Sequence, residues 1–274
     1  MRRSKWMMKL IGKTLALLAV VVLILPANVW AEKKPVGRII AIIGSAEYLP
    51  GDEDSVANAQ PGQVVPVSLT PWQKVQPKQM VYASDEFRTG RKSRLRILFE
   101  DSSLMALGPN SQMTIASYLF DSKEKLRQGV ISIGHGISMY IVNKEQKHPQ
   151  SHFKILSPTA NVAARGTQGY LSISQLKTLV ANQAGLVRAL NADPSVIGDV
   201  MVGPMMKTVI EEGKPPTEPV GLTDAEQNMI QQVIMGWVGS RYREKPRQGS
   251  VVMDALQEEY DLFEEDESDP CTSG

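Results

Sequence analysis

Short apolar runs, separated by turn residues about every 8–12 positions, occupy most of this 274-residue chain and limit what it can fold into. The pattern is clearest at 94–100 (RLRILFE), where Leu95, Ile97 and Phe99 alternate with polar or charged residues, Leu98 excepted. Alternation with a period of two is typical of a strand with one buried face. The sequence therefore predicts an all-β fold, a β-sandwich or β-roll of about a dozen short strands.

The same criteria place the individual strands. Residues 50–80 are rich in Pro, Gly, Gln and Asp, and they are expected to form a long connection with one or two short strands. Outside that connection, the predicted strands cover 36–43, 47–49, 94–100, 104–107, 113–119, 129–142, 153–156, 166–173, 178–181, 186–190, 196–202 and 206–210.

The pattern changes near residue 220. Thr223 and Glu226 match a capping box, in which each side chain bonds a free backbone N–H of the other residue. Met229, Ile230, Val233, Ile234 and Trp237 follow at helical spacing. We expect one C-terminal helix over 223–238, packed by this stripe against the β-structure.

The first 31 residues indicate export. Five basic residues precede an apolar stretch at 14–25, and Val29 and Ala31 supply the small residues of a cleavage site. The stretch is about 12 residues long, whereas a membrane-spanning helix needs roughly 20. We therefore predict a signal peptide over 1–31 with cleavage after Ala31. The expected location is outside the cytoplasm, either periplasmic or secreted.

Charge and cysteine content narrow the class further. Without residues 1–31 the chain holds 25 basic and 29 acidic residues, nine of the latter between 254 and 269. This balance does not favour a nucleic-acid partner, which needs a concentrated basic face. The lone cysteine, Cys271, cannot form an internal disulfide. The expected organisation is a signal peptide (1–31), a β-domain (32–219), a C-terminal helix (220–243) and a disordered acidic tail (244–274).

Several ordered motifs resemble the FecR-type periplasmic domain. They are the opening strand 37–44, the run 85–99, the hairpin segments 99–104 and 107–111, the strand at 128–130, the segment 153–170 and the pair at 178–187. The resemblance covers about 36 to 190. It implies a stand-alone exported β-domain of a type used to sense or bind.

Three departures from the family matter. Ser102 stands where the family usually has Gly, so the turn is expected to use a conformation that a non-glycine can hold. Residues 50–80 are longer than the usual spacing. Family regulators also carry a cytoplasmic anti-sigma segment and a membrane span before the domain, whereas this chain starts with a signal peptide. Signalling across the membrane is therefore not expected to transfer, and the mature chain is not expected to span the membrane.

The segment Arg165, Gly166, Thr167 is the candidate site. In a functional interpretation, a glycine bend presents Arg165 to a partner or an anionic ligand. In an architectural interpretation, which we favour, Gly166 allows a close backbone approach while Arg165 and Thr167 satisfy nearby backbone groups.

Other motifs predict no catalytic, cofactor or metal site. Gly134 and Gly136 flank His135 without the lysine of a phosphate loop, which favours a strand bend. His148 and His152 have the spacing of helical metal ligands, but Pro149 between them indicates a loop. No nucleophile with a placed base and no paired carboxylates in an apolar setting are recognisable.

We therefore expect a non-enzymatic exported binding or sensory module that engages an envelope protein or glycan. The alternative is a structural or assembly protein of the cell envelope that forms oligomers.

Overall fold

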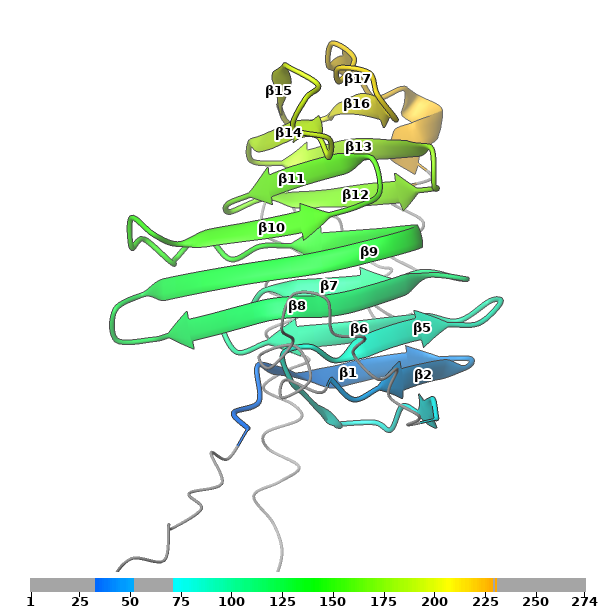
Figure 1. The fold of residues 1–274 in the computed structure, drawn as a ribbon, viewed down its shortest axis with the longest axis vertical. Helices are drawn as coiled ribbons and strands as arrows, with labels where there is room; N and C mark the ends of the chain where they lie inside the picture. The colour runs from blue at the N-terminus through cyan, green and yellow to red at the C-terminus, as the bar shows by residue number, and fades with distance from the viewer. Residues whose placement is uncertain (1–32, 52–70, 229, 231–274) are drawn as a thin grey trace, which may run out of the picture. The chain divides into compact units, whose positions relative to one another are not determined.

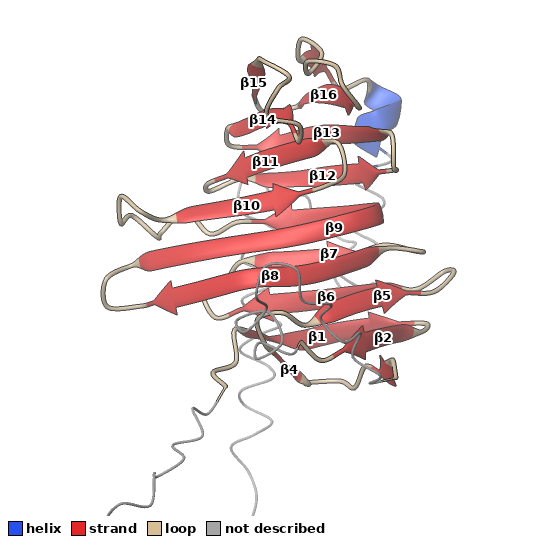
Figure 2. Cartoon of the chain, in the orientation of Figure 1, coloured by secondary structure: helices blue, strands red, loops and turns tan. Residues whose placement is uncertain are grey.

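A computed structural model describes residues 33–51, 71–228 and 230 of the chain (Figures 1 and 2). The described residues form strands joined by turns, with one short helix at 224–228 and 230. The strands are β1 (Gly37–Ile43), β2 (Ala46–Leu49), β3 (Gln73–Lys74), β4 (Met80–Val81), β5 (Glu86–Thr89), β6 (Arg94–Phe99), β7 (Leu104–Leu107), β8 (Gln112–Asp121), β9 (Leu126–Ile141), β10 (His152–Leu156), β11 (Ala160–Ala164), β12 (Gln168–Ile173), β13 (Lys177–Ala184), β14 (Val187–Asn191), β15 (Asp199–Val202), β16 (Met206–Glu211) and β17 (Val220–Gly221).

These strands form two sheets that share β9. Sheet A has the order β4-β1-β6-β7-β9-β12-β13-β16-β17. Sheet B has the order β3-β2-β5-β8-β9-β10-β11-β14-β15. The first part of β9 pairs with β8 and β10, and its last residues pair with β7 and β12 (Figure 1). All pairings are antiparallel except that of β9 with β10.

The chain passes repeatedly from one sheet to the other, and most of these passages contain a glycine. The glycines are Gly44, Gly90, Gly108, Gly136, Gly166, Gly185 and Gly203. At Gly136 the passage lies within β9 itself, and its φ of 103° belongs to a region that glycine enters without steric cost. The predicted strand bend at 134–136 is therefore confirmed.

The main core lies between the two sheets. Strand β7 shows how the sides are divided: Met105 and Leu107 belong to this core, whereas Leu104 and Ala106 belong to a second buried cluster on the outer side of sheet A. In β6, Leu95, Ile97 and Phe99 all lie in the main core, as their alternation predicts. Sheet A is therefore apolar on both faces over part of its width.

The all-β prediction and the single helix near the C-terminus are confirmed. There are more strands than the predicted dozen, partly because β3, β4 and β17 have only two residues each. Strand β11 was not predicted, since its sequence ANVAA has few β-branched residues. The predicted strand 166–173 starts at Gln168, and 196–202 starts at Asp199. Residues 1–31, the helix beyond 230 and the acidic tail lie outside the described residues.

The hairpin of β6 and β7 departs from the expectation for Ser102. The Ser102 N–H donates to the Phe99 carbonyl over 2.9 Å, and the Phe99 N–H donates to the Ser103 carbonyl over 2.8 Å. This is a three-residue loop whose last position requires a left-handed backbone. Ser102 adopts that conformation, with φ of 63°, although it is not glycine.

Candidate functional site

The Arg165–Thr167 segment is the passage from β11 in sheet B to β12 in sheet A. Gly166 has φ of 61°, and a Cβ there would lie 2.6 Å from Cβ of Lys144. The Thr167 carbonyl accepts a hydrogen bond from the Val142 N–H over 2.8 Å. From the other side, Gly185 approaches so closely that a Cβ on it would lie 2.6 Å from the Gly166 carbonyl oxygen. The backbone of this segment is therefore held by neighbours on two sides.

Its three side chains have different environments. Thr167 is buried, Gly166 is half-buried and Arg165 is exposed. Lys144, whose Cβ approaches Gly166, is exposed as well. Within the described part of the chain, Arg165 takes part in no ion pair. The corner therefore presents a guanidinium and an ammonium group from a backbone that is held in place, an arrangement suited to an anionic group.

A second group of polar side chains is closed to solvent. Arg127 is fully buried, and its Nη1 donates to Oδ2 of Asp101 over 2.8 Å. The Tyr118 hydroxyl donates to Oδ1 of the same carboxylate over 2.5 Å, and the Ser103 hydroxyl donates to Oδ2 over 2.7 Å. Asn143 donates through Nδ2 to the Asp101 carbonyl over 2.9 Å. This cluster ties the β6–β7 turn to β8, β9 and the segment after β9.

Aromatic rings enclose the same cluster. Cζ of Arg127 lies 5.4 Å from the centre of the Phe153 ring, and Tyr118 stacks on Phe99 at 4.5 Å. Burial, and next the Asp101 carboxylate, raise the pKa of Tyr118 well above its usual value. The phenol therefore stays protonated as a hydrogen-bond donor, and the cluster is structural.

Asp101 is the turn residue that its sequence context predicts, whereas its ion pair with Arg127 was not predicted. Asp101 does accept the Ser103 N–H through Oδ1 over 3.0 Å, as a turn carboxylate does. The predicted strand began at 129, whereas β9 begins at Leu126. Extending the alternation of Gly129, Ile131 and Ile133 back by one step would have placed Arg127 on the inner face.

The two histidines do not share a helix, as Pro149 between them indicated. His148 lies in the loop before β10 and accepts the Gln150 N–H through Nδ1 over 3.2 Å, and His152 is the first residue of β10. Among the described residues there is no group of three or more His, Cys, Asp or Glu side chains placed to hold a metal ion. No helix in that part of the chain is both long and apolar enough to cross a bilayer.

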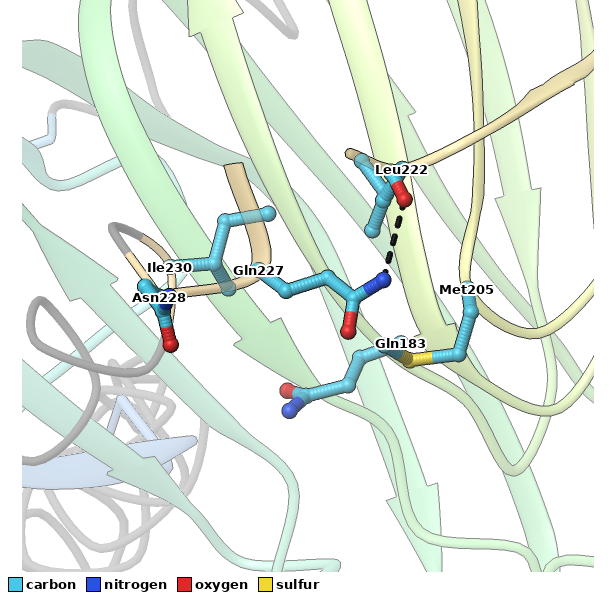
Figure 3. A pocket seen from close by; sticks show the side chains of 6 residues that line it. All are labelled: Gln183, Met205, Leu222, Gln227, Asn228 and Ile230. Atoms are coloured by element: carbon cyan, nitrogen blue, oxygen red, sulfur yellow. Dashed lines mark hydrogen bonds between the residues drawn. The ribbon is translucent and has the colours of Figure 1, made fainter. Parts of the chain in front are cut away.

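A small hollow lies beside the start of the helix (Figure 3). It is lined by Gln183, Met205, Leu222, Gln227, Asn228 and Ile230, and the Gln227 side-chain amide donates to the Leu222 carbonyl over 2.9 Å. Its volume is about 70 Å³. Sites for small-molecule ligands usually measure about 300–1,000 Å³, so this hollow is too small for a typical one.

Two sheets built around a shared strand, with polar side chains at their corners, define a β-structured module. Residues 85–188 match the model of the family described as FecR protein. Over this range the resemblance to the FecR family is confirmed. The matched range contains both the buried Arg127 cluster and the Arg165 corner.

Comparison with solved structures finds two crystal structures of a candidate anti-sigma factor from Parabacteroides distasonis ATCC 8503, at 2.50 Å and 1.65 Å resolution. Each aligns at 12% sequence identity and a TM-score of 0.41, over 54% of this chain. The aligned part spans 63% and 64% of those chains, which is less than two thirds of their length. No curated protein matches the sequence.

Proposed function

We propose that this chain is an exported, non-enzymatic binding or sensory module that engages an envelope protein or glycan through the Arg165 corner. The observation that carries the proposal is the FecR domain at 85–188, because FecR domains occur in envelope-associated regulators. The signal-peptide pattern of residues 1–31 supports the location.

The geometry of the corner supports the place of contact. Arg165 and Lys144 are both exposed and come from segments that approach each other at Gly166. Because the backbone there is already held by β9 and by the Gly185 turn, binding would order little more than two side chains. A surface organised in advance lowers the entropy cost of association. The expected contact on the partner is an anionic group, such as a carboxylate or a phosphate.

A binding assay with a matched control tests the proposal. The labelled chain is incubated with isolated cell envelopes, and with the same envelopes after protease digestion. Arg165→Ala is expected to weaken binding about tenfold or more, because a hydrogen bond to a charged group contributes about 1.5–3 kcal/mol. Arg91→Ala, which removes an equally exposed arginine from the β5–β6 turn, should bind like the parent.

The digested sample separates the two partner classes. Binding that survives digestion indicates a glycan, and binding that is lost indicates a protein. Failure of the parent chain to bind either preparation, or equal weakening by both substitutions, would contradict the proposed contact at Arg165.

The alternative, an assembly protein that forms oligomers, has one observation in its favour. Among the described strands, β15 and β17 each pair on one side only, at the same end of the two sheets. Ile197, Met201 and Val220 beside these edges are 88%, 47% and 54% exposed. Unpaired edges with apolar neighbours can join a second chain. Light scattering over a range of concentrations tests this, since an assembly protein should grow in mass while a binding module stays monomeric.

A further inference from the structure

The outer face of sheet A carries an apolar row that crosses four strands. Register pairs Ala106 of β7 with Met139 of β9, Met139 with Tyr170 of β12, and Tyr170 with Ala181 of β13. All four side chains belong to the second buried cluster, outside the core between the sheets. Leu104 and Ile141, which are paired with each other, widen the same surface.

The outer face of sheet B is different in character. Ser117, Lys154 and Arg188 lie in one cross-strand row there, and all three are exposed. A polar face of this kind is stable in water, whereas a broad apolar face requires a cover. The cover therefore belongs over sheet A.

The start of the C-terminal helix already lies on this surface. Leu222 and Ile230 are members of the same cluster as Met139 and Tyr170. The row continues from Ala181 to Lys207 of β16, and the Lys207 ammonium pairs with the carboxylate of Glu226 in the first helical turn. The helix is thus anchored at the β16 end of the row.

The sequence beyond Ile230 continues the apolar spacing of a helix whose Ile230 face contacts the sheet. Val233, Ile234 and Trp237 follow Ile230 at three, four and seven positions, so a continued helix presents them on the face that carries Ile230. Residues 231–238 would add about 12 Å of helix. Neighbouring strands are about 4.8 Å apart, so this length reaches from β13 across β12 to β9.

Beyond β7 the face carries three arginines. Arg96 of β6 pairs in register with Ala106, and Arg94 and Arg38 lie on the same side of β6 and β1, beside Leu98 and Ile40. After the helix, a basic run at 241–247 comes first, and then nine residues between 254 and 269 are acidic while none of residues 254–274 is basic. The acidic stretch is the part of the chain whose charge is opposite to that of these arginines.

We propose that the outer face of sheet A is the docking surface of the chain's own C-terminal segment. Residues 231–238 cover the row from Ala181 to Met139, and the acidic stretch 254–269 lies over the arginines of β6 and β1. This proposal does not depend on what the Arg165 corner binds.

Thiol labelling of the full chain tests the apolar half. In a Cys271→Ser background, Met139→Cys reports on the face, and Ser117→Cys on the outer side of sheet B is the matched control. Maleimide is expected to modify Met139→Cys about tenfold faster once Val233→Asp and Trp237→Asp are added, because the segment then opens more often. Labelling of Ser117→Cys should not change. Equal rates at Met139→Cys with and without the two aspartates would overturn the proposal.

Two further measurements complete the test. Truncation after residue 243 should speed labelling of Leu98→Cys on β6 while Met139→Cys stays protected; unchanged labelling of Leu98→Cys would overturn the acidic half. If the cysteine variants fail to fold, hydrogen exchange of the unsubstituted chain decides, since docked amides of 231–238 exchange at least about tenfold more slowly than unstructured ones. Unprotected exchange, or protection that weakens on dilution and so indicates a second copy, would overturn the proposal.

Discussion

Ser102 holds a backbone conformation that suits glycine better. Its φ of 63° is needed by the β6–β7 loop, and a non-glycine residue there carries a steric cost of about 1–2 kcal/mol. Part of that cost is offset because glycine is more flexible in the unfolded chain. We predict that Ser102→Gly raises the free energy of unfolding by about 0.5–1 kcal/mol.

Urea unfolding measures this change, and Ser172→Gly is the control. Ser172 is exposed within β12, where glycine should lower stability by about 0.5–1 kcal/mol. If both substitutions lower stability equally, the left-handed backbone at Ser102 is not under strain.

The buried pair of Arg127 and Asp101 should behave as one unit. Arg127→Met leaves the Asp101 carboxylate buried without its cation, which costs about 3–5 kcal/mol. Adding Asp101→Asn removes the stranded charge, so the double variant should lose clearly less than the sum of the single losses. Chemical unfolding of the four proteins gives the coupling.

An exposed ion pair serves as the control for that experiment. Arg188 and Asp199 form an ion pair with exposed side chains, and Arg188→Met should change stability far less than Arg127→Met. Additive losses at Arg127 and Asp101 would mean that the two side chains do not depend on each other.

At the scale of elements, local pattern was a good guide to the strands and a poor one to their extents. Alternation located β6, with its inward residues, correctly. It placed a strand at 129–142 but missed the first three residues of β9, which begins at Leu126, because a buried arginine interrupts the apolar pattern. Two features of β9 depend on residues that are distant in sequence. Arg127 is buried because it pairs with Asp101, and the last residues of β9 join sheet A because they pair with β7.

The helix start gives a pH prediction. The Lys207 ammonium and then the Thr223 N–H and hydroxyl lower the pKa of Glu226 to about 2. A carboxyl group with a lowered pKa stabilises the fold above its unfolded pKa, and this contribution is lost as pH falls through the folded pKa. The docking contribution of Glu226 should therefore be complete above about pH 4.5 and disappear towards pH 2.

Glu226→Gln isolates this effect because glutamine can keep the capping hydrogen bonds without the charge. The variant should melt at a lower temperature than the parent at pH 6 and at the same temperature near pH 2. A gap between the two melting temperatures that stays constant over this range would show that the charge of Glu226 does not contribute.

At the scale of the whole molecule, the glycine passages explain why the candidate segment could be located from sequence but its role could not. Arg165, Gly166 and Thr167 form one of several passages between sheets, and most of the others also contain a glycine. Glycine in a strand-rich sequence therefore signals architecture first. The exposure of Arg165 beside Lys144 depends on how the passage meets β9, which no local pattern encodes.

The proposed site of action requires export, and processing of the N-terminus tests it. After expression of the full chain in a secreting host, the exported protein should have an intact mass that starts at Glu32, because a small residue at position 31 permits cleavage. Ala31→Arg should block cleavage and leave the precursor in the membrane fraction, whereas Glu32→Gln, just after the cut, should be processed normally. A parent chain that keeps Met1 would contradict the signal peptide, and the Arg165 corner would then need a partner on another side of the membrane.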